Sequence, residues 1–149
     1  MQLVDFLLAI DGRSSLYAPD GEFLGLVSSD FDHPLSICNS QGLHGSNYGL
    51  ASIRNPHSMY GGTHGLHSPY NPYSIEPPVI IYQNESVLQV TTNNYLNSDL
   101  PIVEPDVLLG VLIIYGAERA IQNRVISNYE RARRSNAQFI SSIINVGYT

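Results

Sequence analysis

The chain has 149 residues, of which 43% are hydrophobic and only 13% are charged. The charged fraction is about half of the usual ~25%, so the composition argues against an intrinsically disordered chain and indicates a folded protein with a weakly charged surface. Residues 1–106 carry eleven acidic residues against two arginines, a net charge of −9, whereas residues 107–149 carry five arginines against two glutamates, a net charge of +3. The overall acidity argues against nucleic-acid binding.

An apolar segment, residues 1–13, opens the chain. Leu3, Phe6, Leu7 and Ile10 have the spacing of one helical face, although a segment this short also fits a buried strand. The segment lacks the basic start and the small-residue cleavage site of a signal peptide, so we expect it to belong to the core of a cytoplasmic protein. Cys38 is the single cysteine, which leaves no intrachain disulfide.

Two β-hairpins are predicted from alternating apolar residues around turn residues. The first covers residues 15–29, with a turn at Pro19-Asp20-Gly21, and the second covers residues 79–92, with a turn at Gln83-Asn84-Glu85. Between them, residues 35–76 repeat with a period of sixteen. Ser36-Ile37-Cys38-Asn39 recurs as Ser52-Ile53-Arg54-Asn55, and Gly49-Leu50-Ala51-Ser52 recurs as Gly65-Leu66-His67-Ser68. Because glycines supply the positive-φ positions of tight turns, each repeat is predicted to be a short strand, a turn and a short return strand.

These repeats resemble a known bacterial family, described as a four-fold β-flower and including similar cyanobacterial proteins. The resemblance covers roughly residues 14–110 and rests on the runs Ser36-Ile37-x-Asn39, Ser52-Ile53-x-Asn55-Pro56, Ser68-Pro69-Tyr70-Asn71-Pro72-Tyr73 and Pro77-Pro78-Val79-Ile80. It implies four pseudo-equivalent hairpins around an axis, and no catalytic residues. The chain departs from the family's usual repeat motif at residues 39–46 and 55–62, where histidines replace some of the tyrosines.

A long amphipathic helix is predicted for residues 105–149. Pro105 and Asp106 suit its first turn and Gly147 suits its end. We interpret an apolar stripe and nearby arginines as a partner-binding face: Ile121, Val125, Tyr129, Arg131, Arg134, Phe139, Ile140 and Ile143. The longest apolar run, residues 107–117, is about half the ~20 residues that span a bilayer, so we expect no transmembrane segment and disfavour peripheral membrane contact.

Metal and catalytic sites have little support in the sequence. His64 and His67 have a spacing that can chelate a metal from one turn, and His57 lies nearby, but a zinc site normally needs three or four ligands. We therefore predict no metal and no cofactor. Nucleophile-elbow and phosphate-binding motifs are absent from the sequence, so it predicts no enzyme.

The sequence thus predicts a mainly β fold with a C-terminal α extension, in which short antiparallel hairpins with pseudo-symmetry precede one long helix. Its parts are residues 1–13, a repeat-built β-domain at residues 14–104, and the helix at residues 105–149. We expect a non-enzymatic interaction or assembly subunit that docks on another protein or on its own copy through the helix. The alternative is a small-molecule or metal-binding protein that uses the His- and Tyr-lined turns.

Overall fold

The computed structural model describes the backbone of residues 2–147 and the side chains of residues 2–138. The chain forms two compact units, Met1–Gly116 and Ala117–Thr149. Helix α1 (Leu3–Ala9) opens the first unit and buries Leu7, so the N-terminal segment is helical. The helix is too short to be stable alone, and burial of its apolar face must supply that stability.

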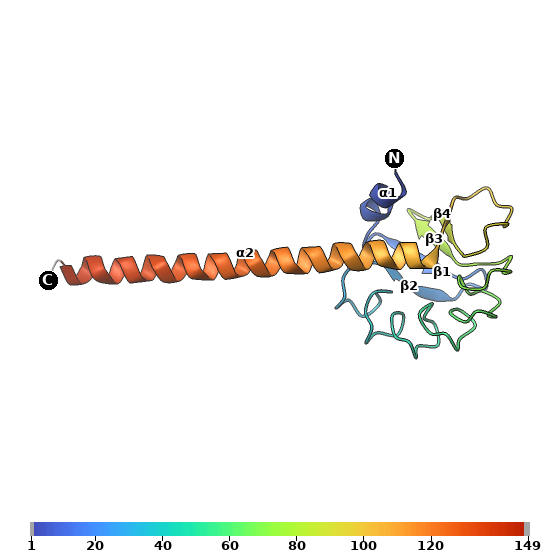
Figure 1. The fold of residues 1–149 in the computed structure, drawn as a ribbon, viewed down its shortest axis with the longest axis horizontal. Helices are drawn as coiled ribbons and strands as arrows, with labels where there is room; N and C mark the ends of the chain where they lie inside the picture. Colours follow the sequence, from blue (N-terminus) through green and yellow to red (C-terminus); the bar gives the residue numbers. More distant parts are fainter. Residues whose placement is uncertain (1, 148–149) are drawn as a thin grey trace. The chain divides into compact units, whose positions relative to one another are not determined.

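A five-stranded mixed sheet organises the first unit (Figure 1). Its strands are β1 (Ser14–Tyr17), β2 (Phe23–Val27), β3 (Val79–Tyr82), β4 (Glu85–Val90) and β5 (Ile102–Val103), in the spatial order β2-β1-β3-β4-β5. The two predicted hairpins, β1-β2 and β3-β4, are confirmed, and they join through antiparallel pairing of β1 with β3. Strand β5 pairs in parallel with β4, which makes the sheet mixed.

The turn between β3 and β4 shows how the sequence sets this register. Gln83 and Asn84 have φ values of 52° and 64°, the left-handed conformation at both central positions that distinguishes the type I′ turn of two-residue hairpins. Asn tolerates this conformation better than most residues, whereas Gln adopts it at a cost. The β3-β4 pairing therefore holds a slightly strained turn in place.

Residues 33–76, called here the turn segment, contain no hairpin, so that prediction is wrong. The segment is a succession of tight turns, drawn cyan to green without arrows in Figure 1. One hydrogen-bond pattern recurs every sixteen residues. The backbone N–H groups of Asn39, Asn55 and Asn71 donate to the carbonyls of Ser36, Ser52 and Ser68, respectively, at 3.2 Å. The side-chain amides of the same asparagines donate to the carbonyls of His33, Gly49 and Gly65 at 2.9–3.1 Å.

Glycines let these turns approach each other closely. A Cβ on Gly45 would lie 2.1 Å from the carbonyl oxygen of Asn39, and one on Gly61 would lie 2.2 Å from that of Asn55. Real Cβ atoms do not come so near, so the turns stack only without side chains at these positions. Serine and asparagine side chains satisfy the backbone locally, which removes the need for a strand ladder.

The core of the first unit combines residues from all its parts. Among its fully buried side chains are Leu7 of α1, Leu24 of the sheet, Ile37 and Ile53 of the turn segment, and Leu108 of the second helix. The turn segment thus contributes apolar side chains to the same core as the strands do. Burying one such side chain stabilises the fold by roughly 1.5–3 kcal/mol.

Helix α2 (Pro105–Gly147) follows β5, and the predicted long C-terminal helix is confirmed. Pro105 stands at its first position, where a missing N–H costs nothing, and Asp106 lies in its first turn near the positive end of the dipole. With a helix of 43 residues and an extensive turn segment, the fold is mixed α and β rather than mainly β.

Candidate functional site

The predicted partner-binding face lies on α2. Ile121, Val125 and Tyr129 are 64%, 61% and 67% exposed. Spacings of four residues place them on one side of the helix. Arg131 and Arg134 are also exposed, and Arg134 lies 4.0 Å from Glu130 one turn earlier, an exposed pair that contributes little to stability. The side chains of Phe139, Ile140 and Ile143 lie outside the described residues.

The three candidate metal ligands are not brought together. His57 and His64 are exposed on the turn segment, whereas His67 is buried and bonded elsewhere. Within the described part of the chain, no three His, Cys, Asp or Glu residues are grouped so that they could hold a metal ion.

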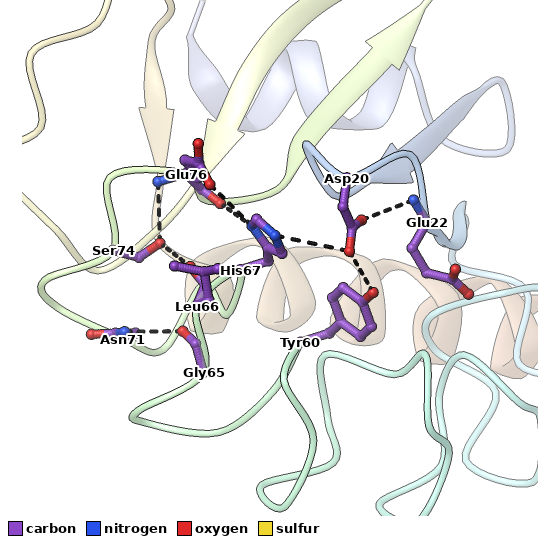
Figure 2. Close-up of polar contacts among 9 residues, drawn as sticks. All are labelled: Asp20, Glu22, Tyr60, Gly65, Leu66, His67, Asn71, Ser74 and Glu76. Carbon is purple, nitrogen blue, oxygen red and sulfur yellow. Dashed lines mark hydrogen bonds and ion pairs between the residues drawn. The ribbon is translucent and has the colours of Figure 1, made fainter.

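His67 lies at the centre of a polar cluster that the sequence did not reveal (Figure 2). Its Nδ1 is 3.0 Å from the carbonyl oxygen of Glu76, and its Nε2 is 3.8 Å from Oδ2 of Asp20, in the β1-β2 turn. The hydroxyl of Tyr60 donates to the same Asp20 oxygen at 2.7 Å, and the Tyr60 ring stacks on the imidazole. Because a carbonyl only accepts, Nδ1 carries a proton and Nε2 faces the carboxylate.

The Tyr60–Asp20 hydrogen bond shifts the pKa of both partners. The bond lowers the pKa of Asp20, because it stabilises the carboxylate. The same bond, with partial burial, raises the pKa of Tyr60 to about 12, because the phenol must lose the proton that it donates. Imidazole, carboxylate and phenol therefore link the β1-β2 turn to the turn segment, which is a structural role.

His44 and Cys38 are two further buried residues whose contacts indicate a structural role. The ring of His44 meets Phe23 edge-on, and its Nδ1 is 3.0 Å from the carbonyl oxygen of Ala51. Cys38 is buried, and desolvation raises its thiol pKa to about 11. A thiol with so high a pKa is a poor nucleophile near neutral pH.

A cleft of about 790 Å³ lies between the turn segment and the first turns of α2, all within the first unit. Arg54, His57, Tyr70 and Asp106 supply its polar lining, and Ile53, Leu109 and Ile113 supply apolar lining. The hydroxyl of Tyr70 donates to Oδ1 of Asp106 at 2.8 Å, and burial together with this bond raises the Tyr70 pKa. The sequence offered no signal for this cleft, because its two walls are about fifty residues apart in the chain.

A scan against protein-family models, a search of curated proteins and a search of solved structures each found no match to the chain. The resemblance to the four-fold β-flower family therefore stays a prediction. Among the described residues, no helix combines the length and the apolar character needed to cross a bilayer.

Proposed function

We propose that the protein is a non-enzymatic assembly subunit, in which the β-domain is a rigid body and α2 binds a second copy of the chain. One observation carries the proposal. Ile121, Val125 and Tyr129 expose more than 60% of their surface along one side of α2. Repeated large apolar side chains on one face of a helix are typical of an interface, since monomers rarely leave such a stripe in water.

Charge favours a second copy as the partner. Residues 107–149 carry a net charge of +3, and residues 1–106 carry −9. Each copy thus holds both an arginine-bearing helix and an acidic region, so two copies supply complementary charges to each other. Charges of this kind mainly orient partners and accelerate their encounter, while the buried apolar side chains hold the complex together.

The test is the mass of the chain in solution, measured by size-exclusion chromatography with light scattering. We expect the wild type to be at least dimeric and the double variant Ile121→Asp/Val125→Asp to be monomeric, because each buried carboxylate would lose its hydration. Asn123→Asp/Ser127→Asp is the matched control: it adds the same two charges on the opposite side of α2. A wild type that stays monomeric at about 100 μM would overturn self-association, because its dissociation constant would then be weaker than that of most specific complexes.

A truncation separates the two parts of the proposal. Removing residues 118–149 leaves the first compact unit, which should remain folded and lose the oligomeric state. If the truncated chain keeps the mass of the wild-type oligomer, α2 is not the assembly element and the proposal fails.

A further inference from the structure

Arg54 is placed in the cleft by a backbone position that does not require arginine. The backbone N–H groups of Cys38, Arg54 and Tyr70, sixteen residues apart, donate to the hydroxyls of Ser36, Ser52 and Ser68 at 3.0–3.1 Å. Cys38 and Tyr70 therefore make the same backbone hydrogen bond as Arg54, although their side chains are very different. Arginine at this position is not explained by the requirements of the turn.

Arg54 is a partly exposed residue that lines the cleft, and no hydrogen bond or ion pair joins its guanidinium to any described residue. The guanidinium is therefore available to pair with an anion that enters the cleft. Asp106, on the opposite wall, uses one carboxylate oxygen to accept the Tyr70 hydroxyl at 2.8 Å, and its second oxygen has no such bond. The cleft therefore presents one cation and one anion that do not neutralise each other.

Apolar surface and an aromatic ring complete the cleft. Leu109 and Ile113 line it from α2, and Tyr48, which is largely exposed, also lines it. A Cβ on Gly110 would meet no atom within 4 Å, so this part of the wall is open. A volume of about 790 Å³ falls within the usual range for small-molecule sites and accommodates a ligand of up to two or three amino acids.

We propose that this cleft binds a small zwitterion with an apolar side chain, either a free amino acid or a short peptide. The ligand's carboxylate pairs with the Arg54 guanidinium, whose planar fork suits two parallel hydrogen bonds. Its ammonium group lies toward Asp106, and its side chain contacts Leu109 and Ile113. This binding is independent of the assembly proposed for α2.

The experiment is ligand-observed saturation-transfer NMR on the full chain with four probes. L-phenylalanine and leucylphenylalanine carry both charges, 3-phenylpropionate lacks the ammonium group, and phenethylamine lacks the carboxylate. We expect saturable binding of at least one zwitterion with a dissociation constant of about 1 mM or tighter. It should exceed the binding of both single-charge probes by about tenfold. The tighter zwitterion then distinguishes a free amino acid from a peptide.

Three variants locate the site. Arg54→Gln should weaken the zwitterion and 3-phenylpropionate about tenfold but leave phenethylamine unchanged, whereas Arg13→Gln, outside the cleft, should change nothing. Asp106→Asn still accepts the Tyr70 hydroxyl and should abolish the preference for an ammonium group. Gly110→Leu fills the open wall while improving helix propensity, so it should abolish binding in a folded protein; Ile114→Leu is its control.

Several results would overturn the proposal. Absence of saturable binding by both zwitterions would do so, as would equal affinity for the four probes. If the Arg54→Gln and Gly110→Leu variants bound the zwitterion with the affinity of the wild type, the ligand would have to bind outside this cleft. A change in oligomeric state alone would bear on α2 and not on this cleft, so the two proposals fail separately.

Discussion

The sheet and the turn segment bury comparable apolar side chains but hold their backbones in different ways. In the sheet, backbone groups pair across strands, as between β1 and β3, and fully buried residues such as Ile80 lie between these ladders. In the turn segment, backbone groups bond to partners three or four residues away, as the Asn55 N–H does to the Ser52 carbonyl, and the Asn55 side chain bonds backbone groups on both sides of itself. The stability of the sheet therefore depends on the volume of its apolar side chains, whereas the stability of the turn segment depends on small and polar side chains.

This difference predicts where each region is vulnerable. A strand tolerates many apolar replacements of similar size, because its backbone bonds do not involve side chains. The turn segment lacks that tolerance, because particular serines, asparagines and glycines make or permit its hydrogen bonds. Substitutions that barely affect a strand should unfold the turns.

The largest effect is expected from Gly61→Ala. Its Cβ would lie 2.2 Å from the carbonyl oxygen of Asn55 and 2.7 Å from that of Ile53, both backbone atoms. Neither can move without breaking the stacked turns, so the variant should lose more than about 3 kcal/mol of unfolding free energy. Gly110→Ala, whose Cβ meets nothing, is the control and should gain up to about 1 kcal/mol. Urea denaturation followed by circular dichroism measures both, and equal stabilities would contradict the close packing.

A smaller loss is expected from Asn55→Ala. The Asn55 side chain donates to the Gly49 carbonyl at 2.9 Å and accepts the His57 N–H at 3.0 Å, and the residue is only 6% exposed. Removing it leaves two backbone groups without their partner, so we expect a loss of about 2 kcal/mol. The exposed Asn97 provides the control Asn97→Ala, which should stay within about 0.5 kcal/mol of the wild type. Equal denaturation midpoints for the two variants would show that the side-chain bonds contribute little.

The same contrast explains what the sequence could and could not predict. Alternating residues around Asn84 and Gly21 identified both hairpins, because strand period and turn chemistry are local signals. The turn segment has an equally visible period, but that period predicts hairpins, which the structure does not contain. Ser52 and Asn55 satisfy the backbone in a way that no strand pattern encodes. The cleft and the His67 cluster join residues far apart in the chain, so no local spacing predicts them.

An intermediate effect is expected at alkaline pH. Burial raises the Cys38 pKa from 9.0 to about 11, and the bond to Asp20 raises the Tyr60 pKa from 10.0 to about 12. Both folded pKa values exceed the unfolded ones, so the folded protein holds these two protons more tightly than the unfolded chain does. The resulting contribution to the unfolding free energy is complete below pH 9 and falls as pH rises toward 12. The loss should be on the order of 1–2 kcal/mol.

Two variants separate these contributions to the alkaline loss. Cys38→Ala should flatten the decline of unfolding free energy between pH 9 and about 11, and Tyr60→Phe should flatten it between pH 10 and about 12. Urea melts at half-unit intervals of pH give the slopes. The Tyr70 pKa is also raised, so a residual slope should persist in the double variant. A wild-type stability that stays flat from pH 8.5 to 11.5 would contradict the buried environments of both groups.

The smallest effect concerns the sheet, and it is a gain. Gln83 and Asn84 adopt φ values of 52° and 64° in the β3-β4 turn, where a two-residue connection favours Asn followed by Gly. The double variant Gln83→Asn/Asn84→Gly should therefore raise the unfolding free energy by about 0.5–1 kcal/mol, by relieving strain that the β3-β4 pairing now holds. Gln83 and Asn84 are exposed, and the one side-chain bond affected is that from Gln83 to the Tyr82 hydroxyl at 3.3 Å. The control Gln83→Ala keeps the strain and loses that bond, so it should not stabilise. A stability unchanged by the double variant would indicate that the turn carries no strain, and that strand pairing alone sets the register of this hairpin.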